Sequence, residues 1–121
     1  MKIAHIFLLL LFAVGMGFGQ LLLKFAAQRQ VPNVEQDLVM RLLTMVFDWP
    51  FVLGAAWYAL MLVYWVWLLT FLPLSRAYPF TLVSLAVAAV GSSIFFQEQL
   101  SARFGLGLLV IAAGLLLVAA E

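Results

Sequence analysis

The chain contains four apolar stretches, each long enough to cross a lipid bilayer as an α-helix. They cover residues 3–27, 51–71, 74–96 and 102–119. A helix needs about 20 predominantly apolar residues to span the hydrocarbon core. In lipid, only helices and closed barrels satisfy every backbone polar group, and these stretches lack the alternating pattern of barrel strands. The sequence therefore predicts an all-α membrane protein of four transmembrane helices, forming a single domain over residues 1–121.

The scarcity of charge supports this fold and excludes several functions. Hydrophobic residues make up 68% of the chain and charged residues 9%, whereas a soluble domain is about half apolar and a quarter charged. With no cysteine and one histidine, His5, the sequence predicts no metal site and no cofactor. It contains no phosphate-binding glycine loop and no nucleophile beside a base, and the net charge of +1 provides no basic patch for nucleic acid. We expect neither an enzyme nor a nucleic-acid-binding protein.

The first apolar stretch also has some features of a secretory signal peptide, because Lys2 precedes it. The stretch exceeds the usual length of about 7–15 residues, however, and Lys24 stands where a small-residue cleavage site would lie. We expect a retained transmembrane helix.

The longest connection joins the first two spans, at about residues 28–50. Its apolar residues recur at helical spacing around Arg41; they are Val34, Leu38, Leu42 and Met45. This pattern predicts either a short helix along the membrane interface or an extension of the second span.

The remaining connections are short, so neighbouring spans should be antiparallel and both termini should lie on one side. Lys2 and Arg76 fall on that side, and Arg29, Arg41 and Arg103 on the other. This distribution is a weak positive-inside signal that favours termini outside. Four helices are few to enclose a transport path, so we expect a dimer.

Lys24 stands inside the apolar run one turn before its end. A lysine near mid-helix costs about 2.5–3.5 kcal/mol on insertion scales, so two interpretations compete. Lys24 either extends to the headgroups or faces a cavity, where it contacts a phosphate or a carboxylate. Gln20 lies one turn away on the same face, and Glu98 ends the third span on the same membrane side, so a Lys24–Glu98 pair is possible.

Glycines occur at spacings typical of helix packing. Gly15 and Gly19 form a GxxxG pattern in the first span, and Gly107 and Gly114 are seven apart on one face of the fourth. Small residues allow close approach of helix backbones. We expect these glycines to mark helix–helix or dimer contacts.

Aromatic residues lie unusually deep in the second span. Tyr64 and Trp65 are too central to be interface anchors, and a tyrosine hydroxyl in the membrane needs a partner. These residues predict either packed core or the wall of a cavity for a large amphipathic ligand.

The third span is interrupted near its start. Pro79 removes a backbone donor, should free the carbonyl of Ser75, and should bend the helix beside Tyr78. Further along, small and hydroxyl-bearing residues share one side of the helix; they are Thr81, Ser84, Ala88, Gly91 and Ser92. They leave room for another helix or for a ligand, and the sequence does not choose between these.

Three segments resemble the drug/metabolite transporter superfamily: GQLLLKFA, LPLSRAYPF and FFQEQLSARFGLGLLVIAAGLLLV. The resemblance covers the whole chain and is clearest over residues 15–28 and 72–118. It is to the four-helix members, which include the small multidrug resistance proteins and the EamA-like subunits that flip aminoarabinose-phosphoundecaprenol. The small multidrug exporters carry a membrane-embedded glutamate eight positions before the lysine of this motif, where this chain has Met16. Ala77, Tyr78, Pro79 and Glu98 look more like the flippase branch.

This resemblance implies a transporter subunit of a bacterial inner membrane, paired as a homodimer or with a related four-helix subunit. The implied substrate is a polyprenyl-phosphate-linked sugar, moved between leaflets. Lys24 and Arg103 would attract its phosphate, and the aromatic wall would hold the prenyl chain or the sugar. The implied substrate-binding residues are Lys24, Gln20, Tyr64, Trp65, Tyr78, Glu98 and Arg103. Two alternatives remain: an exporter of small molecules or cations, and an accessory subunit that transports nothing.

Overall fold

The computed structural model describes residues 2–33, 35 and 37–120, and these residues form helices joined by turns, with no strand among them. The elements are α1 (Ile3–Arg29), η1 (Val31–Asn33), α2 (Leu38–Val46), α3 (Trp49–Leu69), α4 (Leu74–Ala77), η2 (Tyr78–Leu82), α5 (Val83–Phe95) and α6 (Ala102–Ala120). Four segments are long and apolar enough to cross a membrane: α1, α3, the combined α4–η2–α5 segment and α6. The predicted all-α fold with four spans is confirmed.

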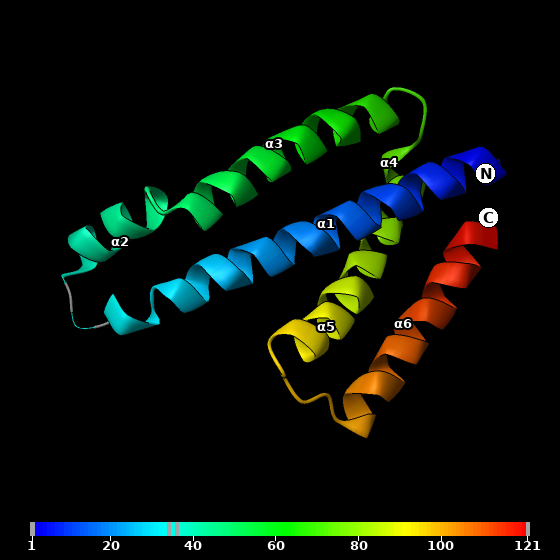
Figure 1. The fold of residues 1–121 in the computed structure, drawn as a ribbon. Coiled ribbons are helices and arrows are strands. Elements are labelled where there is room, and N and C mark those ends of the chain that lie inside the picture. Colours follow the sequence, from blue (N-terminus) through cyan, green and yellow to red (C-terminus); the bar gives the residue numbers. More distant parts are fainter. Residues whose placement is uncertain (1, 34, 36, 121) are drawn as a thin grey trace.

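Helix α1 runs through the middle of the molecule, with α3 on one side and α5 on the other (Figure 1). Helix α6 packs mainly against η2 and diverges from α1 toward its own N-terminal end. Both chain ends lie at the same end of the bundle, as an even number of spans requires. The central position of α1 means that its residues line both of the major helix–helix seams.

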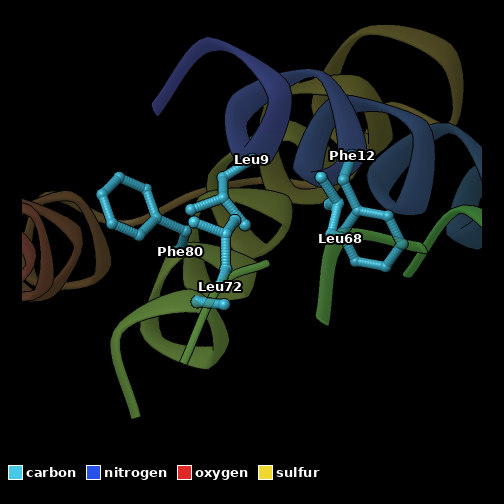
Figure 2. Packing of buried hydrophobic residues seen from close by; sticks show 6 residues of the cluster. Leu9, Phe12, Leu68, Leu72 and Phe80 are labelled. Atoms are coloured by element: carbon cyan, nitrogen blue, oxygen red, sulfur yellow. The ribbon is translucent and has the colours of Figure 1, made fainter. Parts of the chain in front are cut away.

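A hydrophobic core lies at the end of the bundle that holds the termini. It contains Leu9 and Phe12 of α1, Leu68 and Leu72 at the end of α3, and Phe80 of η2 (Figure 2). All five side chains are at most 5% exposed. The core therefore fixes α1, α3 and the start of the third span to one another at this end.

Aromatic side chains of α3 donate hydrogen bonds to the backbone of α1. The Trp57 indole donates to the Gly15 carbonyl at 2.7 Å, and the Tyr64 hydroxyl donates to the Leu8 carbonyl at 2.9 Å. A Cβ built at Gly15 would lie 2.8 Å from the Met61 sulfur. The absence of side chains on the α1 glycines allows α3 to approach closely enough to form these bonds.

The seam between α1 and α5 is also built on glycines. A Cβ at Gly17 would lie 2.5 Å from Cγ1 of Val87, and one at Gly91 would lie 2.5 Å from Cδ1 of Leu21. Each glycine thus receives a branched side chain from the opposite helix. The GxxxG pattern of Gly15 and Gly19 predicts one close helix contact, whereas this second seam depends on Gly17 and Gly91.

The third span is broken where Pro79 removes a backbone donor. Residues Tyr78–Leu82 form a 3₁₀ helix between α4 and α5. The Thr81 hydroxyl donates to the Tyr78 carbonyl at 2.6 Å, and the Ser84 hydroxyl donates to the Thr81 carbonyl. Hydroxyl groups thereby bond backbone carbonyls next to the break, as Ser and Thr do inside membrane helices.

The loop between the first two spans contains α2 as a separate short helix. Asp48 is extended, with φ −75° and ψ 141°, and this conformation separates α2 from α3. Most apolar residues of α2 are exposed, among them Leu38, Leu42 and Leu43. The structure thus contains a short helix that is separate from the second span, and its position along the membrane interface stays a prediction. Val34 of that pattern lies outside the described residues.

A charged clamp joins the end of α1 to the start of α3. Arg29 donates two hydrogen bonds to Asp48, at 2.8 and 3.1 Å, and Gln30 donates a third at 3.2 Å. Asp48 also accepts a bond from the Trp49 backbone N–H and so caps α3. The Arg29 guanidinium lies 5.7 Å from the centre of the Trp49 ring.

We expect this clamp to weaken in acid. The hydrogen bond from Arg29 holds the pKa of Asp48 below its usual range in the folded protein. A carboxyl with a lowered folded-state pKa stabilises the fold above its unfolded pKa, and that contribution is lost as the pH falls through the folded value. The melting temperature of the wild type should therefore decrease when the pH is lowered below about 4. The melting temperature of Asp48→Asn should decrease less over the same pH range. If the melting temperatures of the two proteins depend equally on pH, the Arg29–Asp48 contact does not stabilise the fold.

Candidate functional site

Two cavities lie along one side of α1. The residues Phe12, Met16, Gln20 and Lys24 follow one another at steps of four, so they form a continuous stripe on the helix. The first two line one cavity and the last two line the other. We name these the Tyr78 cavity and the Lys24 cavity.

The Lys24 cavity lies between α1, α5 and the linker to α6, and has a volume of about 470 Å³. It is lined by Gln20, Leu21, Lys24, Leu85, Ala88, Ala89, Ser92, Glu98, Gln99, Leu100, Ser101 and Phe104. Among the described residues, its charged lining groups are one ammonium and one carboxylate. Its size falls in the range of ordinary ligand sites, about 300–1,000 Å³.

Lys24 and Glu98 form an ion pair inside this cavity. The Lys24 Nζ lies 3.4 Å from Glu98 Oε1, and the two side chains are 46% and 45% exposed. The structure thus brings together the two residues whose pairing the sequence makes possible. Because both groups are half-exposed, each retains hydrogen-bonding capacity for a ligand.

An unusual backbone conformation places Glu98. Gln97 has a φ of 55°, in the left-handed region that non-glycine residues adopt infrequently. The chain turns back at this point, so that the Glu98 N–H donates to the Ser92 carbonyl at 3.3 Å. Sequence reasoning missed this turn, because glycine or asparagine would be the usual signal and the chain has glutamine.

Gln20 of the Lys24 cavity lies next to a residue that lines the other cavity. It lines the Lys24 cavity, and its side chain lies beside Tyr58, which lines the Tyr78 cavity. The Tyr58 hydroxyl also lies 3.3 Å from the Met16 carbonyl, to which it donates. Two polar side chains, Gln20 and Tyr58, are therefore neighbours, one from the lining of each cavity.

The Tyr78 cavity lies between α1, α3 and the broken part of the third span, with a volume of about 480 Å³. It is lined by Phe12, Met16, Tyr58, Met61, Leu62, Trp65, Tyr78, Thr81 and Ser84. The rings of Phe12 and Trp65 stack with centroids 4.9 Å apart, and Trp65 meets Tyr78 edge-on at 6.5 Å. The lining is mostly apolar and aromatic, and it includes the hydroxyl-bearing residues Tyr58, Tyr78, Thr81 and Ser84.

Two predicted binding residues lie elsewhere. The Tyr64 hydroxyl is bonded to the Leu8 carbonyl, and Tyr64 is not among the lining residues of the Tyr78 cavity. Arg103 is exposed at the start of α6, whereas its neighbours Ser101 and Phe104 line the Lys24 cavity. The structure thus groups Lys24, Gln20 and Glu98 in one cavity, and Trp65 and Tyr78 in the other.

The glycines of α6 face open space. A Cβ at Gly107 or Gly114 would meet no atom within 4 Å among the described residues. None of the described residues of α6 is buried. Within this chain these glycines therefore make no close helix contact.

The chemistry available is recognition of charge and of apolar surface. An ammonium can bind a phosphate and a carboxylate can bind a cation, while the aromatic cavity can hold an apolar chain. No group of three or more metal-ligating side chains occurs in the described part of the chain. The fold and these cavities define a four-span α-helical membrane protein with a charged cavity beside its central helix.

Comparison with known proteins shows similarity to flippase subunits over part of the chain. Three curated proteins carry the description "Probable 4-amino-4-deoxy-L-arabinose-phosphoundecaprenol flippase subunit ArnE". They come from Aeromonas hydrophila, Aeromonas salmonicida and Hamiltonella defensa, and are 46%, 44% and 37% identical over 54 residues. The matches cover 45% of this chain and 47%, 47% and 49% of the relatives, so the chain spans about half the length of the curated relatives it matches.

These relatives are transport proteins rather than enzymes by their description. No protein-family model matches the chain, and no solved structure matches it.

Proposed function

We propose that this chain is a subunit of a membrane flippase that moves a polyprenyl-phosphate-linked sugar between leaflets. The observation that carries the proposal is the position of Lys24, whose ammonium lines a cavity near one end of a membrane-spanning helix. The similarity to flippase subunits supports this class of substrate. A bacterial inner membrane is the location that this function requires.

In this proposal the headgroup and the lipid chain bind different parts of the α1 stripe. The phosphate contacts Lys24, and the sugar hydroxyls find polar partners in Gln20 and Ser92, which line the same cavity. The apolar chain or the sugar passes along the aromatic lining of the Tyr78 cavity, beside Trp65 and Tyr78. The headgroup thereby exchanges water for protein partners while the chain stays in an apolar environment.

The proposed flippase contains a second subunit, which is another copy of this chain or a related four-helix chain. Gly107 and Gly114 leave the surface of α6 without side chains at two positions, and none of the described residues packs against them. Helices associate closely in lipid through such residues. A partner packed against α6 would help to enclose the transport path, which four helices alone are too few to surround.

Export of small cations is disfavoured by the residue at position 16. Met16 lines the Tyr78 cavity, and it occupies the position where the multidrug exporters carry their glutamate. A thioether neither exchanges a proton nor pairs with a cationic drug. The Tyr78 cavity thus lacks the charged group that such export requires.

Transport in reconstituted vesicles tests this function. The full chain is extracted in mild detergent together with any bound subunit, and vesicles carry a polyprenyl-phosphate sugar in both leaflets. Membrane-impermeant periodate should oxidise about half of the lipid in empty vesicles and nearly all of it in vesicles that hold the protein. Under a proton gradient, the same vesicles should take up no quaternary ammonium compound. If oxidation stops at half of the lipid in both preparations, the proposal is refuted. If the vesicles take up the cation and no carboxylate mutation abolishes this uptake, Met16 is no evidence against cation export.

A further inference from the structure

The short helix α2 has a polar side and an apolar side. Arg41 and Thr44 are its polar residues, and because they are three positions apart they share one side of the helix. The opposite side has the spacing of a single apolar face and carries Val39, Leu42, Leu43 and Val46. We name these four residues the α2 apolar face.

The α2 apolar face points away from the rest of the molecule. All four of its side chains are exposed, and no residue of α2 is buried. The half-buried residues of α2 are Arg41 and Met45, which are four positions apart and so lie on one side. The side with the arginine therefore faces the protein. Water-soluble proteins have the reverse arrangement, with the apolar side of a surface helix turned inward.

The place of α2 in the chain puts it at the boundary of the bilayer. It lies at the end of the bundle opposite the termini (Figure 1), and two residues, Phe47 and Asp48, separate it from the membrane-spanning helix α3. Phe47 and Trp49 are 80% and 57% exposed, and tryptophan is enriched where spans meet the headgroups. Val52 and Leu53 are exposed as well, so exposed apolar surface continues from α3 through this junction into α2.

We propose that the α2 apolar face docks into the lipid leaflet on its side of the membrane, where acyl chains cover its valines and leucines. Arg41, on the opposite side of the helix, keeps its guanidinium among the headgroups. Interfacial helices bury their apolar face by about 5–10 Å at the boundary between headgroups and acyl chains. This inference concerns how the chain contacts its membrane, and it does not depend on what the chain transports.

A lipid leaflet fits this face better than a second protein subunit does. Helices that pack against one another in lipid use small residues, which let their backbones approach. The α2 apolar face consists of two valines and two leucines, and so offers no such residue. Helix α6 differs, because Gly107 and Gly114 leave its surface open. A protein partner is therefore expected on α6, and lipid on α2.

Apolar area rather than charge holds α2 at the leaflet. Interfacial helices that rely on anionic lipids are rich in Lys and Arg on their polar face. Helix α2 has one such residue, Arg41, and Asp37 precedes it by four positions. The nearby Arg29 is already paired with Asp48. Docking should therefore require neither anionic lipid nor low salt.

Site-directed fluorescence tests this proposal, because the chain has no cysteine of its own. Leu42→Cys and Thr44→Cys each carry an environment-sensitive fluorophore; both positions are exposed, and they lie on nearly opposite sides of α2. Leu43→Cys repeats the measurement on the apolar face. Leu60→Cys, exposed in the middle of α3, and Glu35→Cys, exposed in the loop before α2, are the membrane and water references.

The full chain, with any bound subunit, is reconstituted into phosphatidylcholine vesicles. These vesicles contain lipids spin-labelled either near the top or near the end of the acyl chain, and iodide is present on both sides of the membrane. The fluorophores at Leu42 and Leu43 should emit at shorter wavelength than the one at Thr44. They should be quenched more by the upper spin label than by the lower one and be protected from iodide. Iodide should quench the fluorophores at Thr44 and Glu35, and the lower spin label should quench the one at Leu60.

Three results would overturn the proposal. Iodide quenching at Leu42 and Leu43 as strong as at Thr44 would place the apolar face in water. Protection of both positions from iodide and from the lipid spin labels would show that protein covers the face. Quenching by lipid that appears only when phosphatidylglycerol is added, or that disappears in high salt, would show that charge holds α2 at the membrane. The same quenching pattern with and without phosphatidylglycerol, and at low and high salt, supports docking through apolar area.

Discussion

Gly17→Ala is expected to lower the free energy of unfolding by about 1–3 kcal/mol, the usual cost of overpacking a closely packed site. The new Cβ would lie 2.5 Å from Cγ1 and 2.6 Å from Cβ of Val87. Since the Cβ of Val87 is fixed to its own backbone, rotation of that side chain cannot remove the overlap. Helices α1 and α5 would have to separate, which also disturbs the wall of the Lys24 cavity.

Two further glycines provide a graded control for this prediction. A Cβ at Gly91 would meet the flexible end of the Leu21 side chain. Gly91→Ala should therefore lower the free energy of unfolding by less than Gly17→Ala does. Adding Leu21→Ala to Gly91→Ala should offset this loss. Gly107 faces open space, so Gly107→Ala should stabilise the isolated chain slightly through helix propensity. The free energy of unfolding of these four variants is measured in mixed detergent micelles. Equal stability of Gly17→Ala and Gly107→Ala would contradict the packing of this seam.

Lys24→Ala is expected to reduce lipid transport by about 10- to 100-fold, the effect of losing one charged hydrogen bond to the phosphate. The fold should remain, because the Lys24–Glu98 pair is half-exposed and such pairs contribute about 0–1 kcal/mol. Lys24→Arg keeps the positive charge and should retain most of the activity. Transport in the vesicle assay and a thermal melt measure the two effects separately.

A lysine that only extends to the headgroups would behave differently. Full transport by a well-expressed Lys24→Ala protein would therefore refute the phosphate contact. Adding Glu98→Gln to Lys24→Ala should remove the unpaired carboxylate without restoring transport. Recovery of transport in the double variant would show that the carboxylate, rather than the missing ammonium, blocked the path.

The four spans could be predicted because lipid imposes a simple condition on the backbone. Each span must be long and apolar, and both properties are visible in the sequence. The break in the third span could be predicted for a similar reason, since Pro79 cannot donate a backbone hydrogen bond wherever it lies. Local chemistry decides these features, and tertiary contacts change them little.

The details of the site depend on helix register, which a single sequence does not reveal. Trp57, Tyr58 and Tyr64 donate to carbonyls of α1 some 42 to 56 residues away, and nothing local specifies which carbonyl each reaches. For this reason the sequence leaves open whether Tyr64 packs in the core or faces a cavity, whereas the structure bonds its hydroxyl to the Leu8 carbonyl. The approach of Lys24 to Glu98 was foreseeable because antiparallel topology places both at one end; the left-handed turn at Gln97 was not.

The unequal lengths of the spans create a hydrophobic mismatch within one molecule. Helix α1 has 27 residues and α6 has 19, which at about 1.5 Å per residue corresponds to roughly 40 and 28 Å. A hydrocarbon layer of about 30 Å fits α6 and is too thin for an upright α1. Lipids next to α1 must stretch unless that helix tilts, whereas those next to α6 need not. If α1 stands upright, the bilayer around the protein is stepped, and a headgroup crossing beside α6 has the shorter distance to travel.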